Sequence, residues 1–246
     1  MSRNGALWRS KGSLATGLLA IALLTAVGCT PEAEVETGIE VAETAEWRSL
    51  FDGETLDGWR GYGLERLPAG WSAADGEIHF VAPEEGERAD LITVEQFQSF
   101  ELSFDWKVSE GGNSGVMFHV TEDHNRAYET GAEYQILHNA GHPDGESGMT
   151  SAGSNYALHA PAVDSTRPLG EFNEARLLVD GSHVEHWLNG EKLLEYTLWD
   201  EEWKERVAAS KFAAMPDYGL RETGHIVIQD HGDEIWLRNI KIRTLP

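Results

Sequence analysis

The clearest pattern in the chain is a strict alternation of hydrophobic and polar residues between positions 100 and 108, which read FELSFDWKV. Successive side chains of a strand point to opposite faces of a sheet. This segment therefore predicts an antiparallel strand with one face in the core and one face in solvent.

Residues 112–139 predict two further strands joined by a polar loop. Alternation places Ser114, Val116, Phe118 and Val120 on one face of the first strand, and Gly115, Met117 and His119 on the other. In the second strand it separates Ala132, Tyr134 and Ile136 from Glu133, Gln135 and Leu137. The polar faces would bring together the carboxylate of Glu133, the amide of Gln135 and the imidazole of His119. Such a group indicates either a functional site or an ordinary wet face of an antiparallel sheet, and the pattern alone leaves both open.

Turn dipeptides punctuate the rest of the chain, at Asp75-Gly76, Asp180-Gly181 and Asn189-Gly190. They separate about a dozen short strands, which predict an all-β fold, a jelly-roll sandwich of two antiparallel sheets. The segment 200–210 predicts one short helix, since Asp200 can cap it. Residues 139–173 form a long polar loop with His142, Tyr156 and His159. Loops of this length are usually functional or disordered, and we expect a functional one.

The first 28 residues predict a lipoprotein signal peptide. Three basic residues precede an apolar stretch at 14–27, which is too short to span a bilayer comfortably. Ala26-Val27-Gly28-Cys29 then resembles a bacterial lipobox, with Ala26 where Leu is usual. Cys29 is the only cysteine, so we expect it to carry the lipid. The alternative is an ordinary secretory signal cut after Gly28.

Residues 29–46 predict an acidic, flexible tether, because they contain six Glu, no basic residue and no aromatic residue. The folded domain is expected at 47–246. Thr30, rather than Asp, follows the cysteine. We therefore expect a lipid-anchored protein of the bacterial cell envelope, on the outer membrane or facing the periplasm.

The formal net charge of −23 argues against nucleic acid as a partner and against attraction to anionic lipid headgroups. Contact with a membrane is expected only through the lipid anchor.

Six short motifs occur in order along the domain: LFDGETLDGW at 50–59, NSGVMF at 113–118, GAEYQIL at 131–137, HWLNG at 186–190, GHIVIQDHG at 224–232 and RNIKI at 238–242. Together they resemble the domain of unknown function 1080 family, often labelled 3-keto-disaccharide hydrolase. The resemblance runs from about residue 50 to residue 245. Two positions depart from the family pattern: His138 stands where Asp is frequent, and Phe172 stands where Trp is frequent.

The resemblance implies a concanavalin-like jelly roll with a carbohydrate site on its concave sheet. It also implies an enzyme that acts on glycosides whose sugar ring a separate 3-oxidoreductase has already oxidised at carbon 3. A ketone at carbon 3 acidifies the proton at carbon 2, so the group on carbon 1 can leave by elimination and water can add back. This route needs a base for carbon 2, stabilisation of the enolate and an acid for the leaving oxygen.

Ordinary concanavalin-like glycosidases carry a Glu-x-Asp-x-x-Glu strand, and no Glu-x-Asp occurs in this chain. Glu133 is therefore our candidate base or metal ligand, and His231 our candidate acid, base or ligand. The alternative for His231 is a turn histidine that caps Asp233. Gln135 is expected to bind sugar hydroxyls. The other candidate substrate-binding residues are Asn113, His119, His138, Tyr156, His159, Trp187, Asp230 and Arg238.

Several of these candidates have plain alternatives. His119 would otherwise be a satisfied strand histidine, Trp187 a buried core residue, and Arg238 a partner in an ion pair. A divalent metal stays open, because a mixed nitrogen and oxygen donor set is available without a compact ligand motif. That set is Glu133, His119, His138, His142 and His231. The competing functions are a non-catalytic carbohydrate-binding envelope lipoprotein and a structural envelope protein without a ligand.

Overall fold

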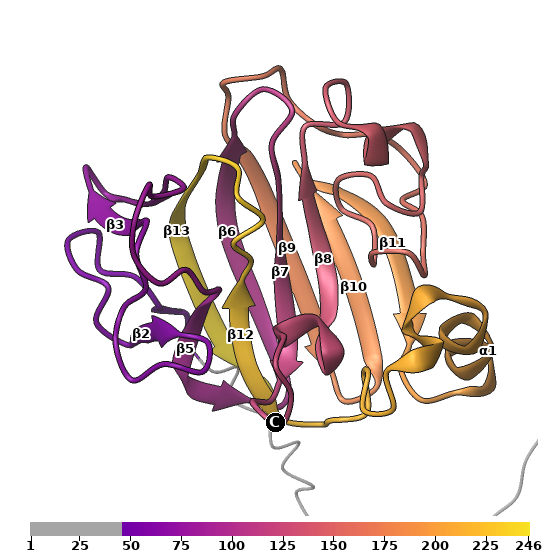
Figure 1. Ribbon diagram of the computed structural model, residues 1–246. Coiled ribbons are helices and arrows are strands. Elements are labelled where there is room, and N and C mark those ends of the chain that lie inside the picture. The colour runs from indigo at the N-terminus through magenta and orange to yellow at the C-terminus, as the bar shows by residue number, and fades with distance from the viewer. Residues whose placement is uncertain (1–45) are drawn as a thin grey trace, which may run out of the picture. The chain divides into compact units, whose positions relative to one another are not determined.

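The computed structural model describes residues 46–246, which form two antiparallel sheets packed face to face (Figure 1). The eight-stranded sheet, called sheet A here, has the order β11 (Glu191–Thr197), β10 (His183–Leu188), β9 (Asn173–Asp180), β6 (Phe100–Val108), β13 (Ile235–Thr244), β4 (Glu77–Phe80) and β3 (Trp71–Ala74), and β1 (Arg48–Ser49) also pairs with β13. The five-stranded sheet, called sheet B, has the order β2 (Trp59–Gly61), β5 (Leu91–Phe97), β12 (Gly224–Ile228), β7 (Asn113–Val120) and β8 (Ala132–Leu137). The predicted jelly-roll sandwich is confirmed.

The core lies between the two sheets, and strand β6 illustrates how the sequence builds it. Its bounds are those that the alternation predicts. Phe100 and Phe104 are fully buried, and Trp106 is nearly so. Burying one such aromatic side chain stabilises the fold by roughly 1.5–3 kcal/mol. The predicted turn at Asp75-Gly76 joins β3 to β4, and the one at Asp180-Gly181 joins β9 to β10.

Register across sheet B defines which side chains face away from the core. Leu91, Ile228, Val116 and Tyr134 form one row across β5, β12, β7 and β8, and this row is buried between the sheets. The neighbouring rows must point to the outer face. One outer row is Ile92, Val227, Met117 and Glu133, and the other is Asp90, Gln229, Gly115 and Gln135.

His119 does not share this outer face, which corrects the expectation from alternation. Its positive φ of 54° marks a local irregularity near the end of β7. The ring turns toward Phe100 and Phe118, and Nε2 lies 2.7 Å from the carbonyl oxygen of Gln98. Val120 packs instead with the outer residues around Met117. The alternative of a satisfied strand histidine is met only at Nε2, because Nδ1 is buried without a hydrogen-bond partner among the described residues.

The connection between β8 and β9 covers the free edge of sheet B. Gly153 donates to the carbonyl oxygen of Gln135 at 2.8 Å, and Gln135 donates to that of Ser154 at 3.0 Å. Tyr156 donates its backbone N–H to the carbonyl oxygen of Glu133 at 3.1 Å. The long loop is therefore paired with the edge strand that carries two candidate site residues, and it also contains the short helix η2 (Pro143–Glu146).

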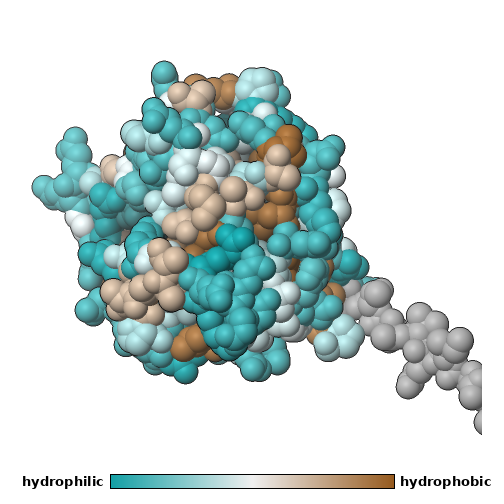
Figure 2. Space-filling view, turned by 90° about the vertical axis from the view of Figure 1, so that its right-hand side faces the viewer, coloured by the Kyte–Doolittle hydropathy of each residue, from teal (hydrophilic) through white to brown (hydrophobic). Residues whose placement is uncertain are grey.

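The predicted helix is α1 (Glu201–Ala209), which lies beyond the β11 edge of the sandwich (Figure 1). Asp200 caps it by accepting from the backbone N–H of Trp203 at 2.7 Å. The chain continues into η3 (Lys211–Ala214); a further short turn, η1 (Ala127–Glu129), joins β7 to β8. Within residues 46–246, no helix is long and apolar enough to cross a membrane. On the side of the molecule seen in Figure 2, hydrophilic residues dominate and hydrophobic ones form small separate groups.

Candidate active site on the outer face of sheet B

Glu133 lies on the outer face of sheet B, on its edge strand β8. It lies opposite Met117 on β7, and its side chain leans over Gly115. A Cβ atom at position 115 would overlap Oε1 of Glu133, so the missing side chain is what makes room for the carboxyl. Glu133 is only 6% exposed. This burial, opposed by the charge of Lys211 and assisted by the nearby carboxylates of Asp90 and Asp144, raises its pKa to about 8.

A cation and a phenol stand beside Glu133 on the β8 side. The ammonium group of Lys211, from η3, lies 4.1 Å from the centre of the Tyr156 ring. The Tyr156 hydroxyl donates to Oδ2 of Asp144 at 3.1 Å. Burial lowers the pKa of Lys211, and the charges of Glu133 and Asp144 partly restore it. Tyr156 is thus placed where the sequence predicts it, and Lys211 adds a positive charge to the site.

Two amides lie near Glu133 on the outer face of sheet B, from β8 and β7. Gln135 donates from Nε2 to Oδ1 of Asn113 at 3.1 Å, and both residues are buried. The other amide atom of Gln135, Oε1, is buried without a hydrogen-bond partner among the described residues. The backbone N–H of Asn113 donates to Oδ2 of Asp233 at 3.1 Å. The predicted pair of Gln135 and Asn113 is therefore assembled.

His231 lies at the rim of this face. Its Nδ1 is 3.6 Å from Oδ2 of Asp233, and its ring faces that of His142 edge-on at 6.3 Å. Its contacts are with Asp233 and His142 and not with Glu133 or Gln135, so the geometry matches a turn histidine beside Asp233 more closely than a group next to Glu133.

The opposite end of the face is polar as well. Asp230 forms a two-pronged ion pair with Arg88 and donates its backbone N–H to Oδ1 of Asp90 at 2.9 Å. These residues line a cavity of about 420 Å³. Its other lining residues are Tyr62, Ala89, Asn125 and Arg126.

Trp187 and Arg238 belong to the other sheet, which corrects their assignment to the site. Trp187 projects from the outer face of sheet A, where the guanidinium of Arg176 covers its ring at 4.0 Å. Arg238 is on the same outer face, paired with Asp105 at 3.2 Å. A ligand on sheet B cannot reach them because the core separates the two faces. The alternative of a structural ion pair therefore holds for Arg238.

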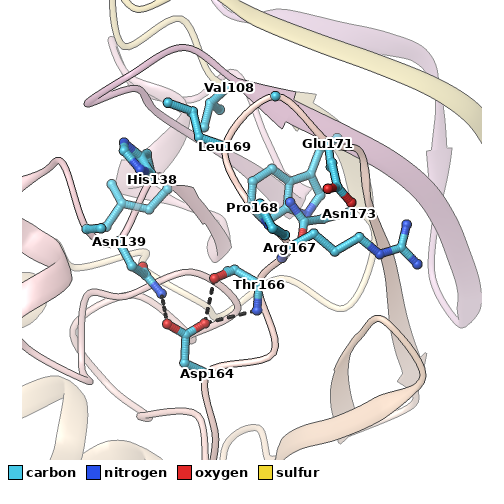
Figure 3. Close-up of a pocket in the computed structure, with 14 residues that line it drawn as sticks. Val108, His138, Asn139, Asp164, Thr166, Arg167, Pro168, Leu169, Glu171 and Asn173 are labelled. Carbon is cyan, nitrogen blue, oxygen red and sulfur yellow. Dashed lines mark hydrogen bonds between the residues drawn. The ribbon is translucent and has the colours of Figure 1, made fainter.

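His138 lies at a second cavity, of about 340 Å³, near the loop at residues 164–173 (Figure 3). Its Nδ1 accepts from the backbone N–H of Gly111 at 2.9 Å. Asp164 organises the nearby loop by accepting from Asn139 at 3.1 Å and from the hydroxyl of Thr166 at 2.7 Å. None of these contacts links His138 to Glu133, so the structure does not bring it to the site.

His159 faces a different pocket, formed with β11 and α1. Its ring stacks on Tyr196 at 4.6 Å and hydrogen-bonds to the amide of Asn155 at 3.0 Å. Burial lowers its pKa to about 4. A neutral, stacked histidine here is part of the packing of the loop against α1, not of the outer face of sheet B.

The five candidate metal ligands are not assembled, because His119 and His138 are held in separate contacts away from Glu133. In the described part of the chain, His183, Glu185 and Glu195 do place one ligand atom each within 4.8 Å of one another. Lys192 already lies 2.6 Å from Glu195 and 3.3 Å from Glu185, so a cation neutralises these carboxylates.

Sequence reasoning missed three groups of this site: Gly115 as a spacer, Lys211 and Asp90. A glycine inside a strand is a known sign of close approach, so Gly115 could have been recognised. Lys211 and Asp90 come from segments distant in the sequence and carry no local signal.

An all-β sandwich with a buried carboxyl, a cation and two amides on one sheet face offers the polar groups that a carbohydrate-binding site uses. Residues 46–243 match the family model described as the 3-keto-alpha-glucoside-1,2-lyase-like domain. The chain belongs to this family, so the predicted family is confirmed.

Relatives of this chain agree with that placement. A 3-keto-disaccharide hydrolase of Bacteroides thetaiotaomicron is 37% identical over 225 residues, which cover 80% of this chain and 78% of the relative. A crystal structure from Parabacteroides distasonis, described as a presumed glycosyl hydrolase, is 34% identical with a TM-score of 0.76, covering 81% of this chain and 94% of that one. A second presumed glycosyl hydrolase from that organism is 26% identical with a TM-score of 0.62, covering 81% and 100%.

Proposed function

We propose that this chain cleaves the glycosidic bond of 3-keto glycosides by elimination followed by hydration, with Glu133 as the proton donor to the leaving oxygen. The observation that carries the proposal is the burial of the Glu133 carboxyl over Gly115, inside the family motifs at 113–118 and 131–137. The substrate must already carry a ketone at carbon 3, so a separate sugar 3-oxidoreductase has to act first.

The raised pKa changes the role expected for Glu133. A carboxyl with a pKa of about 8 keeps its proton at neutral pH. It is therefore suited to protonate the oxygen that leaves carbon 1, whereas a base would have to be ionised before the reaction starts. From the sequence we expected Glu133 to act as a base, because the alternation of hydrophobic and polar residues does not show that its carboxyl is buried over Gly115.

Lys211 supplies positive charge where negative charge develops. Removing the carbon 2 proton puts charge on the ketone oxygen, and a fixed ammonium group stabilises such an enolate in a site shielded from water. Lys211 lies over the Tyr156 ring, and the nearby carboxylate of Asp144 favours its charged form. We therefore assign to Lys211 the stabilisation of the enolate.

The amides of Gln135 and Asn113 would orient the sugar ring through its hydroxyls. Leaving the buried Oε1 of Gln135 without a donor costs about 1–3 kcal/mol. A hydroxyl of a bound sugar would offset that cost, which favours a polyhydroxylated ligand over an apolar one.

Replacing Glu133 with Gln tests this proposal. The amide is nearly the same shape but has no acidic proton, so turnover of a 3-keto disaccharide should fall by about 10²–10⁴-fold. The measurement is sugar release from 3-keto disaccharides and from their unoxidised parents.

A suitable control is Glu201→Gln, because Glu201 is an exposed residue of α1 on another part of the molecule. Full activity of the Glu133→Gln variant would remove this residue from the mechanism. A wild-type protein that binds glycans but releases no sugar from any keto substrate would favour the non-catalytic binding function.

A further inference from the structure

The proposed elimination leaves one role unfilled: a group that accepts the carbon 2 proton. Lys211 is a poor choice because a positive charge there stabilises the enolate, and the Tyr156 hydroxyl already donates to Asp144. A second carboxyl on the same face of sheet B is available at the other end of the site.

Register places Asp90 in the same outer row as Gly115 and Gln135. Leu91 lies opposite Ile228, and Ile228 lies opposite Val116. Asp90 precedes Leu91, and Gln229 follows Ile228 and donates to the carbonyl oxygen of Gly115 at 2.9 Å. The row therefore runs from Asp90 on the β5 side to Gly115 on β7, with Gln229 between them; Figure 1 shows the strands of this sheet in one layer.

The two carboxyls lean toward each other along this row. Asp90 accepts from the backbone N–H of Asp230, which brings its carboxyl toward the β12 chain. Glu133 leans in the opposite direction, from β8 over Gly115 on β7. Neighbouring strands are about 4.8 Å apart, so the carboxyls are separated by between one and two strand spacings, roughly 5–10 Å. The charge of Asp90 is one of the causes that raise the pKa of Glu133, as this proximity requires.

Asp90 is also accessible to a ligand. It is half-buried and lines the cavity of about 420 Å³. Substrate pockets typically measure roughly 300–1,000 Å³. Asp90 lines this cavity and Glu133 does not, so a sugar ring would have to extend from the cavity across β12 and β7 to contact both carboxyls.

We propose that Asp90 is the base that removes the carbon 2 proton, while Glu133 protonates the leaving oxygen. This inference rests on the proposed function. The carbon 2 proton passes to Asp90, and its electron pair forms the enolate of the ketone. The carbon 1–oxygen bond then breaks, and the departing oxygen takes the proton of Glu133. The products are an unsaturated 3-keto sugar and the free alcohol.

Hydration runs through the same two groups with their roles exchanged. Water adds its oxygen to carbon 1 and gives a proton to ionised Glu133. Protonated Asp90 returns a proton to carbon 2. Both residues regain their starting states, and the net reaction is hydrolysis. Burial raises the pKa of Asp90 to about 6, still below that of Glu133, so at neutral pH the first is mainly ionised and the second mainly protonated.

Hydrogen exchange on an analogue without a leaving group separates the two roles. A 1,5-anhydro-3-keto sugar has the acidic carbon 2 proton but nothing to eliminate at carbon 1. In D₂O the wild type should exchange this proton for deuterium, followed by NMR. Asp90→Asn should slow the exchange by about 10²–10⁴-fold, whereas Glu133→Gln should stay within a few-fold of wild type.

A substrate with a good leaving group gives the opposite pattern. A 4-nitrophenyl 3-keto glycoside needs no proton on its leaving oxygen, so Glu133→Gln should recover most of its cleavage and Asp90→Asn should not. Asp105→Asn is the control, because Asp105 is likewise a half-buried aspartate but lies on the outer face of sheet A, where it pairs with Arg238. It should behave as wild type in both assays.

Asp90→Asn keeps an oxygen that can accept from the Asp230 N–H, so the fold should survive, and a melting temperature checks this. If the Asp90→Asn variant does not fold, the Asp90→Ala variant with added formate takes its place. Exchange restored by formate supports the inference, and exchange that formate does not restore counts against the inference. If the Asp90→Asn variant exchanges the carbon 2 proton at the wild-type rate, the inference is overturned while the proposed function stands. A wild type that neither exchanges nor cleaves any 3-keto compound overturns the proposed function itself.

Discussion

Gly115 lies on β7 where the carboxyl of Glu133 crosses the strand, and a larger residue would fill the space that this carboxyl occupies. Gly115→Ala should therefore displace Glu133 and lower turnover by about 10²-fold, because a misplaced catalytic group loses much of its effect. Its φ is not positive, so alanine is compatible with the backbone. Turnover and a circular dichroism spectrum together make the measurement.

Gly148→Ala is the control for this substitution. Gly148 is exposed in the β8–β9 loop, and its nearest neighbour to an added Cβ would be the methyl group of Ala160. An active Gly115→Ala enzyme with a normal spectrum would show that the close approach is not required.

The buried carboxyl of Glu133 also has a consequence for stability. Its pKa is about 8 in the folded protein, above the ordinary 4.5. The folded state therefore holds a proton that the unfolded state has released between these values, so this residue makes the fold less stable as pH rises from about 5 to 8. Glu133→Gln removes this effect. The free energy of unfolding of this variant should exceed that of wild type by on the order of 1–3 kcal/mol at pH 8, but by little at pH 4.5. Denaturant unfolding of both proteins at the two pH values is the measurement; an equal difference at both would contradict the buried, protonated carboxyl.

At the scale of elements, helix α1 leads directly into η3, and η3 carries Lys211 to the site. Asp200 caps α1 through the backbone N–H of Trp203, whose side chain is buried. Asp200→Ala should destabilise the protein by about 1 kcal/mol, measured by thermal unfolding. Glu201→Ala, which changes a highly exposed side chain in the next position, should cost much less. Equal effects would mean that the cap does not hold the helix.

The sequence predicts the elements well because strands and hairpins are local. The strand at 100–108 and the turn at Asp180-Gly181 follow from period-two alternation and turn chemistry alone. The same alternation placed Glu133 and Gln135 on one face correctly. The alternation was wrong at His119. The positive φ of this residue interrupts the regular strand, so its side chain no longer points to the predicted face, and no residue type in the sequence indicates this irregularity.

At the scale of the whole molecule, the limit of sequence reasoning is which sheet a strand joins. Alternation shows that Trp187 and Arg238 point away from the core, but a sandwich has two such outer faces, on opposite sides. Asp90, Lys211 and Glu133 meet only because strand order in sheet B brings β5 beside β12 and β7 beside β8. That order depends on long-range pairing, which a single sequence does not encode in any short segment.

The predicted signal peptide at 1–28 and most of the tether at 29–46 lie outside the described residues, and the lipid anchor on Cys29 stays a prediction. We expect the mature protein to begin with a lipid-modified Cys29 and to fractionate with membranes. Cys29→Ser should release it into the soluble envelope fraction with its activity intact, because the described domain starts well after this position. Mass spectrometry of the mature N-terminus and fractionation are the measurements. An unmodified cysteine at the mature N-terminus would exclude the anchor.

The short strand β1 pairs with the last strand of the domain, with Arg48 opposite Ile242 and Ser49 opposite Lys241. The first and the last strand of the described domain therefore lie side by side, so a short linker would be enough to connect them. A circular permutant could join these two points with a short linker and open the chain at the exposed turn at 180–182 instead. β5, which Asp90 directly precedes, and the strands that carry Gly115 and Glu133 would keep their neighbours. The outer face of sheet B should then keep its arrangement wherever the polypeptide starts.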